Sequence, residues 1–336
     1  MNAADAAQRA DAVRRGAGLF RLRDRALLAV RGGDRVRWLD GMLSNDVARL
    51  APGPSRSGCY ALLLSPQGRI LADFHVLQRG EEVWLEMEAR VAADVRALLE
   101  RYIVADDVLL EDRSAGIARI GIEGAAAPEL LARALGRTPA LAADCADDFE
   151  LAGTRVCVAA FGWSGAPAFQ LFAPGDAGDA LVAALGAAAP PGIPLVEGDD
   201  EVLEILRIEA GIPRLFHELD ANTLPPEAGL VPRAVSLTKG CYTGQEIVAR
   251  LVSRDAASHH LVALRFTGEP PAPGTELRVD NRVVGAVTSS CRSARLGPIG
   301  LGFARRPFDA EGTELAAGAE RARVARPPLV PATDPA

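Results

Sequence analysis

The chain has 336 residues, of which 49% are hydrophobic and 24% are charged. This length and composition predict two or three folded domains and exclude a disordered or fibrous protein. The formal net charge is −7 and the pI is near 5.3, so we expect no direct nucleic-acid partner, because an acidic surface repels phosphates. The apolar runs fall far short of the roughly 20 residues that cross a bilayer, and the N-terminal segment lacks the apolar stretch of a signal peptide. We therefore expect a cytoplasmic protein with no membrane partner.

The five cysteines are widely scattered, and no two of them form a Cys-x-x-Cys pair. An odd number of cysteines at such spacing disfavours a disulfide framework. The same spacing disfavours a structural zinc site, so the sequence predicts no metal site. The five are Cys59, Cys145, Cys157, Cys241 and Cys291.

Helical and strand patterns mix in the first half of the chain. Asp34 precedes a short apolar stretch and predicts a capped helix that begins at Arg35. Residues 60–65 and 69–77 have the character of strands, and the Pro-Gln-Gly sequence between them predicts a hairpin turn. Apolar residues then recur at helical spacing over 92–102.

The second strand of the predicted hairpin carries two titratable side chains. Asp73 and His75 are two residues apart and share one face, because side chains alternate along a strand. If that face lines a cleft, the two form a proton-handling or orienting pair. If it faces water, they are ordinary solvated side chains.

Residues 199–210 predict a helix with one apolar face, which Gly211 ends. Glu209 lies in the last turn, where a carboxylate opposes the helix dipole, so helix stability does not explain its presence. One explanation is an ion pair with a nearby arginine such as Arg207 or Arg214. The other is a ligand site, because a carboxylate accepts two parallel hydrogen bonds from an amino-pyrimidine edge such as that of a pterin.

The segment from Lys239 to Glu246 reads Lys-Gly-Cys-Tyr-Thr-Gly-Gln-Glu. Thr243, followed three residues later by Glu246, is a capping box that predicts the start of a helix. Cys241 then precedes the positive end of that helix and is close in sequence to Lys239, an arrangement that stabilises a thiolate. The segment therefore holds either a reactive cysteine or a small cysteine buried in a glycine-flanked turn.

Beyond Ser258 the pattern becomes almost entirely β, which predicts a separate small β domain. Proline is frequent in the last ten residues, which predicts a disordered end. The strand-like stretches are 260–267, 276–279, 283–289 and 299–304.

The segment from Lys239 to Glu246 resembles the K-G-C-Y-x-G-Q-E signature of the YgfZ family, folate-binding proteins that are related to the glycine cleavage T-protein. Other segments of the chain also fall in the order of this family, and the resemblance covers about residues 15–325. These segments are 39–47, 64–73, 163–165, 206–213 and 287–290.

The resemblance implies an α+β protein with a ring-like fold of two interleaved α/β subdomains and a C-terminal β-barrel. Tetrahydrofolate or a folate derivative would bind in the central hole. Residues 15–257 would form the folate-binding core and 258–325 the barrel, with 1–14 and 326–336 as flexible tails. The resemblance further implies transient work with iron–sulfur enzymes or assembly proteins, in their assembly or repair, and only an indirect effect on transfer RNA modification.

The family motifs also assign roles to individual residues. Cys241, with Lys239 beside it, would be the residue on which the activity depends, and Glu209 would hold the pterin. Asp73 lies where related aminomethyltransferases keep a catalytic aspartate. The expected folate-binding residues are Glu209, Arg207, Tyr242 and Gln245.

Three functions follow from these assignments. The first is a tetrahydrofolate-binding accessory protein for iron–sulfur enzymes, which we expect because T-proteins lack the Lys-Gly-Cys-Tyr signature at this place. The second is an aminomethyltransferase, in which Asp73 orients or activates a one-carbon fragment that passes to folate from a lipoylated carrier. The third is a scaffold with a vestigial folate pocket. In the first case Cys241 would meet a cluster only transiently, because one cysteine cannot supply the four usual ligands.

Overall fold

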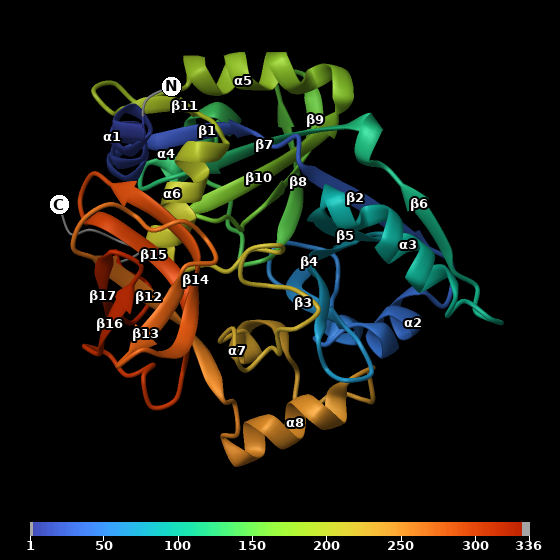
Figure 1. Ribbon diagram of the computed structural model, residues 1–336. Helices are drawn as coiled ribbons and strands as arrows, with labels where there is room; N and C mark the ends of the chain where they lie inside the picture. The colour runs from blue at the N-terminus through green and yellow to red at the C-terminus, as the bar shows by residue number, and fades with distance from the viewer. Residues whose placement is uncertain (1–2, 331–336) are drawn as a thin grey trace.

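The computed structural model describes residues 3–330. Figure 1 shows two mixed α/β units and a barrel around the loop that follows helix α6. The first unit is a six-stranded sheet in the order β11-β1-β7-β10-β9-β8, and β1 pairs with β11 in parallel. Helices α4 (Ala127–Leu135) and α5 (Gly178–Ala187) pack on it through buried leucines. The strands are β1 (Ala17–Arg21), β7 (Ile117–Glu123), β8 (Ala146–Leu151), β9 (Thr154–Ala159), β10 (Ala168–Pro174) and β11 (Leu195–Gly198).

The second unit is an antiparallel five-stranded sheet in the order β3-β4-β5-β2-β6. Helices α2 (Arg35–Met42) and α3 (Ala92–Glu100) bury Trp38, Leu39 and Leu99 against it. The predicted hairpin and both predicted helices are confirmed, but the Asp34 side chain does not cap the first helix, because it accepts a hydrogen bond from the N–H of Asp107. The strands are β2 (Arg25–Arg31), β3 (Gly58–Leu64), β4 (Ile70–Arg79), β5 (Glu82–Glu88) and β6 (Leu109–Asp112).

The chain passes between the two sheets twice. Strand β1 joins the first sheet, the next five strands build the second sheet, and β7 to β11 return to the first. The expected interleaving of two α/β subdomains is therefore confirmed. Short 3₁₀ turns also occur at Val47–Arg49, Ala89–Val91, Ser114–Gly116 and Gly175–Ala177.

The C-terminal unit is a closed barrel in the order β12-β15-β14-β13-β16-β17, in which β12 also pairs with β17. This confirms the expected β domain. Ile208 of α6 (Asp200–Ala210) packs against Ala263 and Leu301 and so joins the barrel to the α/β units. The strands are β12 (His259–Phe266), β13 (Glu276–Val279), β14 (Arg282–Ser293), β15 (Gly297–Arg305), β16 (Glu314–Ala317) and β17 (Glu320–Ala325).

The N-terminal segment is not the flexible tail that we expected. Helix α1 (Ala3–Arg15) buries Ala10 and Val13 against α6. Its alanine side chains are short enough for two helices to pack closely, so the segment is ordered by its contact with α6. At the other end, the backbone N–H groups of Leu329 and Val330 both point to the carbonyl of Glu209. Residues 326–330 are thus docked as well, and 331–336 lie outside the described residues.

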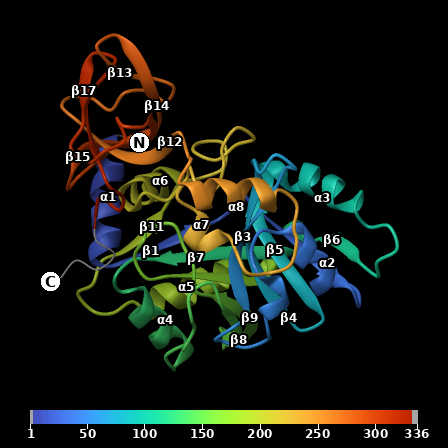
Figure 2. The ribbon, with the colours of Figure 1, turned by 90° about the horizontal axis from the view of Figure 1, so that it is seen from below.

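The last helices before the barrel are α7 (Val231–Ala234) and α8 (Gln245–Arg254), and Figure 2 shows α8 lying across β3. The expected capping box does not form. Gly244 is the N-cap in a left-handed conformation (φ 82°) and no side chain caps the helix. A Cβ at Gly244 would crowd Ser65 and Gly68 in the β3–β4 turn, so close packing on that turn fixes where the helix begins.

Candidate functional site

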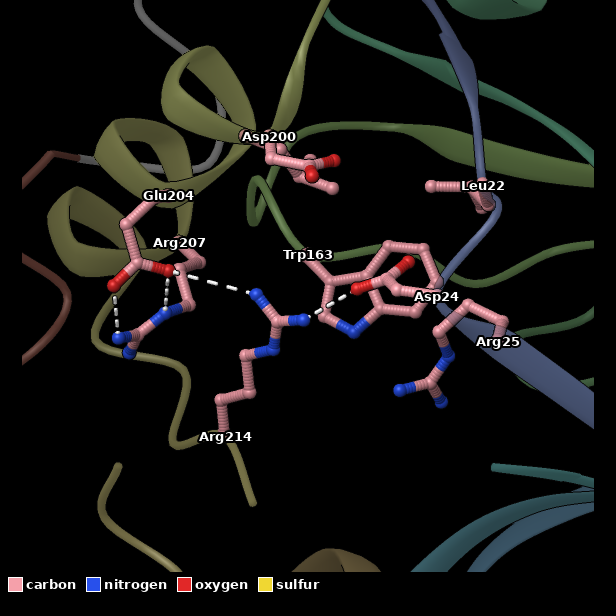
Figure 3. A pocket seen from close by; sticks show the side chains of 9 residues that line it. Leu22, Asp24, Arg25, Trp163, Asp200, Glu204, Arg207 and Arg214 are labelled. Carbon is pink, nitrogen blue, oxygen red and sulfur yellow. Dashed lines mark hydrogen bonds and ion pairs between the residues drawn. The ribbon is translucent and has the colours of Figure 1, made fainter. Parts of the chain in front are cut away.

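A recess lies beside α6, where this helix approaches the start of β2 and the loop after β9 (Figure 3). The indole of Trp163 forms one flat wall, and most of the remaining side chains are charged. We call it the α6 recess. It is lined by Leu22, Asp24, Arg25, Trp163, Asp200, Leu203, Glu204, Arg207 and Arg214.

Helix α6 brings several of these side chains together. It forms as predicted, because the Asp199 carboxylate accepts a hydrogen bond from the N–H of Val202 (3.0 Å) and Gly211 ends the helix with φ 69°. Residues three apart lie on the same helix face. Glu204 and Arg207 therefore both point to the recess, while the apolar positions pack on α1.

The guanidinium of Arg214 extends into the recess between carboxylates, as Figure 3 shows. It pairs with Asp24, and its Nη2 lies 3.1 Å from Glu88 while its Nη1 lies 3.9 Å from Glu204. Burial lowers the pKa of Arg214, but these carboxylates outweigh it and raise the pKa above its ordinary value. The side chain leaves a free volume of about 20 Å³, which holds about one water molecule.

Behind the recess, Arg25 belongs to a buried ionic network. It donates to Glu86 (2.6 and 3.0 Å) and to Glu88 (3.0 Å), and Arg119 also donates to Glu86 (2.6 Å). Burial raises the pKa of Glu86, but Arg119 and Arg25 together hold it well below its ordinary value. The network fixes Arg25, whose guanidinium lies 5.2 Å from the centre of the Trp163 ring.

Asp73 of β4 lies close to this network. Its Oδ2 accepts a 2.8 Å hydrogen bond from the hydroxyl of Tyr60 on β3. Its Oδ1 is buried and has no hydrogen-bond partner among residues 3–330. The Asp73 charge also acts on Arg25. Burial lowers the pKa of Arg25, but Glu86, together with Asp73, outweighs this effect and raises the pKa above its ordinary value. A buried carboxylate oxygen without a donor is costly, so this atom marks a place where a ligand N–H fits.

His75 also lies on this part of β4, but it is not bonded to Asp73. Its ring stacks on Phe161 with the centroids 3.6 Å apart, and its Nδ1 is 3.2 Å from the carboxylate of Asp144. Burial lowers the pKa of His75, so the neutral ring donates its Nδ1–H to Asp144. Tyr60 lies between the two side chains: its hydroxyl donates to Asp73, and its ring centre lies 5.2 Å from that of His75. Neither of the two predicted side chains is an ordinary solvated group.

Glu209 points away from the α6 recess. Its carboxylate is buried, pairs with Arg14 of α1 and accepts a hydrogen bond from the hydroxyl of Ser293 in β14. The ion pair that we considered from the sequence therefore exists, but its partner is Arg14 and not Arg207 or Arg214. The reason is that α1 packs against α6. The assignment of Glu209 to the pterin stays a prediction.

Arg207 lines the recess, yet its donors already have acceptors. It donates to Glu204 (2.7 Å), to Glu218 (2.9 Å) and to the hydroxyl of Ser289. Glu218 in turn accepts a 2.8 Å hydrogen bond from Thr288. These bonds tie α6 and the following loop to strand β14, which gives Arg207 a structural role beside its predicted one.

Trp163 is held in place by Glu123, a residue that the sequence did not single out. The N–H groups of Trp163 (3.1 Å) and Ser164 (3.0 Å) and the Ser164 hydroxyl (2.5 Å) all donate to the Glu123 carboxylate. A Cβ at Gly162 would collide with that carboxylate, so only glycine fits there. Burial raises the pKa of Glu123 to about 7, against the lowering effect of these hydrogen bonds.

Lys239 is buried, and its side chain serves the end of helix α2. Its ammonium donates to the carbonyls of Asp40, Leu43 (3.0 Å) and Asn45 (2.8 Å) and lies 3.0 Å from the Asp40 carboxylate. A cation at a helix C-terminus satisfies carbonyls that lack a helical partner. Lys239 is therefore an anchor for the motif loop, and any catalytic part for it stays a prediction.

The other motif residues differ in exposure. Cys241 is exposed, three residues before the N-cap of α8. Tyr242 is buried, and its hydroxyl has no hydrogen-bond partner in the described part of the chain. Burial raises its pKa to about 12. Gln245 is the first residue of α8. None of the four predicted motif side chains lines the α6 recess.

A second hollow of about 700 Å³ lies between Trp84, Phe172, Arg79 and Asp148, and it holds none of the predicted site residues. Within residues 3–330 no group of three or more His, Cys, Asp or Glu side chains is arranged to hold a metal ion. The helices described here include none with the length and apolar character needed to cross a membrane.

Comparison with known protein families shows to which family the chain belongs. Residues 2–239 match the GCVT N-terminal domain, and residues 259–330 match the glycine cleavage T-protein C-terminal barrel domain. The chain belongs to the glycine cleavage T-protein family. The first match ends before α8, and the second begins with β12.

Curated T-protein relatives cover nearly the whole chain. The aminomethyltransferase of Streptomyces avermitilis is 32% identical over 90% of this chain and 82% of its own length, and that of Saccharopolyspora erythraea is 31% identical over 93% and 84%. The crystal structure of glycine cleavage system aminomethyltransferase T from Bartonella henselae matches with a TM-score of 0.84 and 22% identity over 97% of this chain and 90% of that chain. This last match shows the T-protein fold. The expected relation to the glycine cleavage T-protein is thus confirmed. These relatives bear the name aminomethyltransferase.

Proposed function

We propose that this protein binds tetrahydrofolate or a folate derivative between its two sheets and transfers to it the carbon of an aminomethyl group carried on a lipoyl thiol, with release of ammonia and the free thiol. The observation that supports this most is the hydrogen bonding of the Asp73 carboxylate. One of its oxygens is fixed by Tyr60, and the other is buried without a partner within residues 3–330. The names of the relatives favour the same chemistry.

The residues present fit a folate. The flat wall of Trp163 suits a pteridine ring, since aromatic rings bind by stacking. The carboxylates of the α6 recess suit the N–H groups at the edge of that ring. Oδ1 of Asp73 suits a donor or a positive charge farther along the ligand. Folate would supply the nitrogen that accepts the one-carbon fragment.

The protein's own part is to orient the reactants. Tyr60 keeps the Asp73 carboxylate in one orientation, so the free oxygen is aimed before any ligand arrives. A carboxylate in a site with little water stabilises an adjacent cationic centre more than it would in solvent. The Arg25 network behind the recess is buried and ion-paired throughout, so it stays rigid while ligands exchange.

Two measurements on one sample test this proposal. Calorimetry with tetrahydrofolate tests binding, and an assay for transfer from an aminomethylated lipoyl carrier tests the reaction. Binding together with transfer that Asp73→Asn abolishes is the expected result. Binding without transfer would exclude the transferase function. Absence of binding would exclude folate as the ligand and leave a scaffold protein.

A second candidate function rests on Cys241. This thiol is exposed beside a helix start, on a loop that the buried Lys239 anchors. Such a loop suits transient contact with iron–sulfur enzymes or their assembly proteins, as the YgfZ resemblance implies. Tyr242 and Gln245 would then stabilise the loop or contact folate from it.

Cys241→Ser separates the two candidates. For the transferase, folate binding and transfer in the variant should equal those of the wild type. For the accessory protein, the variant should fail to restore iron–sulfur enzyme activity in cells that lack the native protein, with folate affinity unchanged. Cys157→Ser, which alters a buried cysteine away from this loop, serves as the matched control.

A further inference from the structure

We propose that the guanidinium of Arg214 holds the place of a planar, N–H-bearing ring edge in the α6 recess, and that the ligand displaces it. This inference rests on the proposed function and deepens it. It assigns recognition of the ring edge to Asp24 and Glu88.

The two groups have the same chemistry. A guanidinium is flat and presents adjacent N–H donors in its plane. A 2-amino-4-oxopyrimidine edge, such as that of a pterin, contains the same N–C(N)–N unit with adjacent N–H donors. Carboxylates that accept hydrogen bonds from one can accept them from the other. In Figure 3 the Arg214 guanidinium occupies the space between the carboxylates, near the flat Trp163 ring.

Arg214 differs from the other two arginines that line the recess. The side chains of Arg25 and Arg207 are 7% and 2% exposed, and each is held by two carboxylates. The side chain of Arg214 is 26% exposed, and it pairs with Asp24, which is 36% exposed. Arg214 is therefore the most exposed of these three, and its long side chain can turn toward water more readily than the other two.

The backbone at Arg214 does not need to move. Its N–H donates to Glu218 (3.1 Å), and its carbonyl accepts from the N–H groups of His217, Glu218 and Leu219. The exchange is thus a rotation of one side chain. A fixed backbone with a partly exposed head is an arrangement that suits an internal placeholder.

The charges left behind define the ligand class. Without the Arg214 head, Glu88 still has Arg25, and Glu204 still has Arg207. Asp24 loses the ion pair that it has in the structure. The recess would then favour a neutral or cationic planar edge with at least two N–H donors and would repel an anionic one.

Displacement predicts an unusual mutant. An internal group that must leave before the ligand binds lowers the apparent affinity by the fraction of molecules that are open. Arg214→Ala should therefore bind tetrahydrofolate about tenfold more tightly than the wild type, while Asp24→Asn should bind at least tenfold more weakly. Arg79→Ala, which removes an arginine paired with Asp148 in the other hollow, should bind like the wild type.

A second readout does not depend on folate. Methylguanidinium should raise the melting temperature of Arg214→Ala more than that of the wild type, because it can refill the vacated place. Arg214→Ala that binds tetrahydrofolate as the wild type does, or more weakly, would overturn the inference. If no variant binds tetrahydrofolate but methylguanidinium still stabilises Arg214→Ala, the proposed function is wrong and the inference about Arg214 stands. Absence of that stabilisation as well would overturn both.

Discussion

The hydroxyl of Tyr60 fixes one oxygen of Asp73 and leaves the other buried without a partner inside the described range 3–330. Burial first, and then the neighbouring Asp73 charge, raise the pKa of Tyr60 well above its ordinary value. The tyrosine therefore stays protonated and remains a donor at any physiological pH.

Asp73→Asn should lower the aminomethyl transfer rate by a factor of about 100 or more, because an amide cannot stabilise a cationic centre as a carboxylate does. Tetrahydrofolate affinity should change far less. Tyr60→Phe, which keeps the ring but releases the carboxylate, should lower the rate by about tenfold. Single-turnover kinetics and calorimetry measure the two effects, and an Asp73→Asn protein that transfers at the wild-type rate would remove Asp73 from the reaction.

Glu209→Gln should lower the free energy of unfolding by about 1–3 kcal/mol, since the change weakens a buried pair and leaves Arg14 poorly matched. Urea unfolding measures this loss. Tetrahydrofolate affinity should stay close to that of the wild type if the ion pair with Arg14 is the whole role of Glu209. A loss of affinity of about 1.5–3 kcal/mol with unchanged stability would instead establish Glu209 as the pterin ligand predicted from the sequence.

Glu123→Gln should change how stability depends on pH. The pKa of Glu123 is about 7 in the folded protein, against an ordinary value of 4.5. Between these values the folded state binds more protons than the unfolded state, so this group makes the free energy of unfolding fall as pH rises. The glutamine variant lacks that titration. Its stability relative to the wild type should improve by about 3 kcal/mol from pH 4.5 to 8.

Urea unfolding of both proteins at several pH values measures this difference. Glu227→Gln is a matched control, because Glu227 is also buried and accepts a backbone hydrogen bond, from Leu224 (2.8 Å), at a site remote from Trp163. A constant difference between Glu123→Gln and the wild type across the range would show that Glu123 does not titrate there.

Lys239→Arg should lower the free energy of unfolding by about 1–3 kcal/mol. Lys239 is the only lysine in the chain. Its compact ammonium donates to three carbonyls that converge on one point, a geometry that the flat fork of arginine does not match. Denaturant unfolding measures the loss, with the exposed Arg49→Lys as the reverse control. Equal stability of Lys239→Arg and the wild type would contradict the anchoring role.

The sequence predicted the elements whose signal is local. The β3–β4 hairpin and the helix ended by Gly211 follow from strand alternation, turn residues and apolar spacing, and both are confirmed. The capping box at Thr243 failed because tertiary contact overrode it: the β3–β4 turn approaches Gly244 so closely that the glycine became the cap. Helix α1 was missed because its small alanines mean little until α6 is present.

The α6 recess could not be predicted, because its parts lie far apart in the chain. Asp24 and Arg25 come from the start of β2, Trp163 from the loop after β9, and Arg214 from the loop after α6. Each is an ordinary charged or aromatic residue in its own segment. The one local signal was the carboxylate at Glu209, which does mark a buried ion pair, but on the opposite side of the helix from the recess.

The pairing of Arg14 with Glu209 also affects the order in which parts of the structure can form during synthesis. These residues are 195 positions apart, and β1 likewise waits for its parallel neighbour β11. A chain emerging from the ribosome therefore carries its first helix unpaired, with an apolar alanine face open to water, until more than half of the polypeptide has been made. Strands β2 to β6 form a sheet among themselves and can mature earlier. The nascent chain should thus acquire its second sheet first and complete its first sheet last.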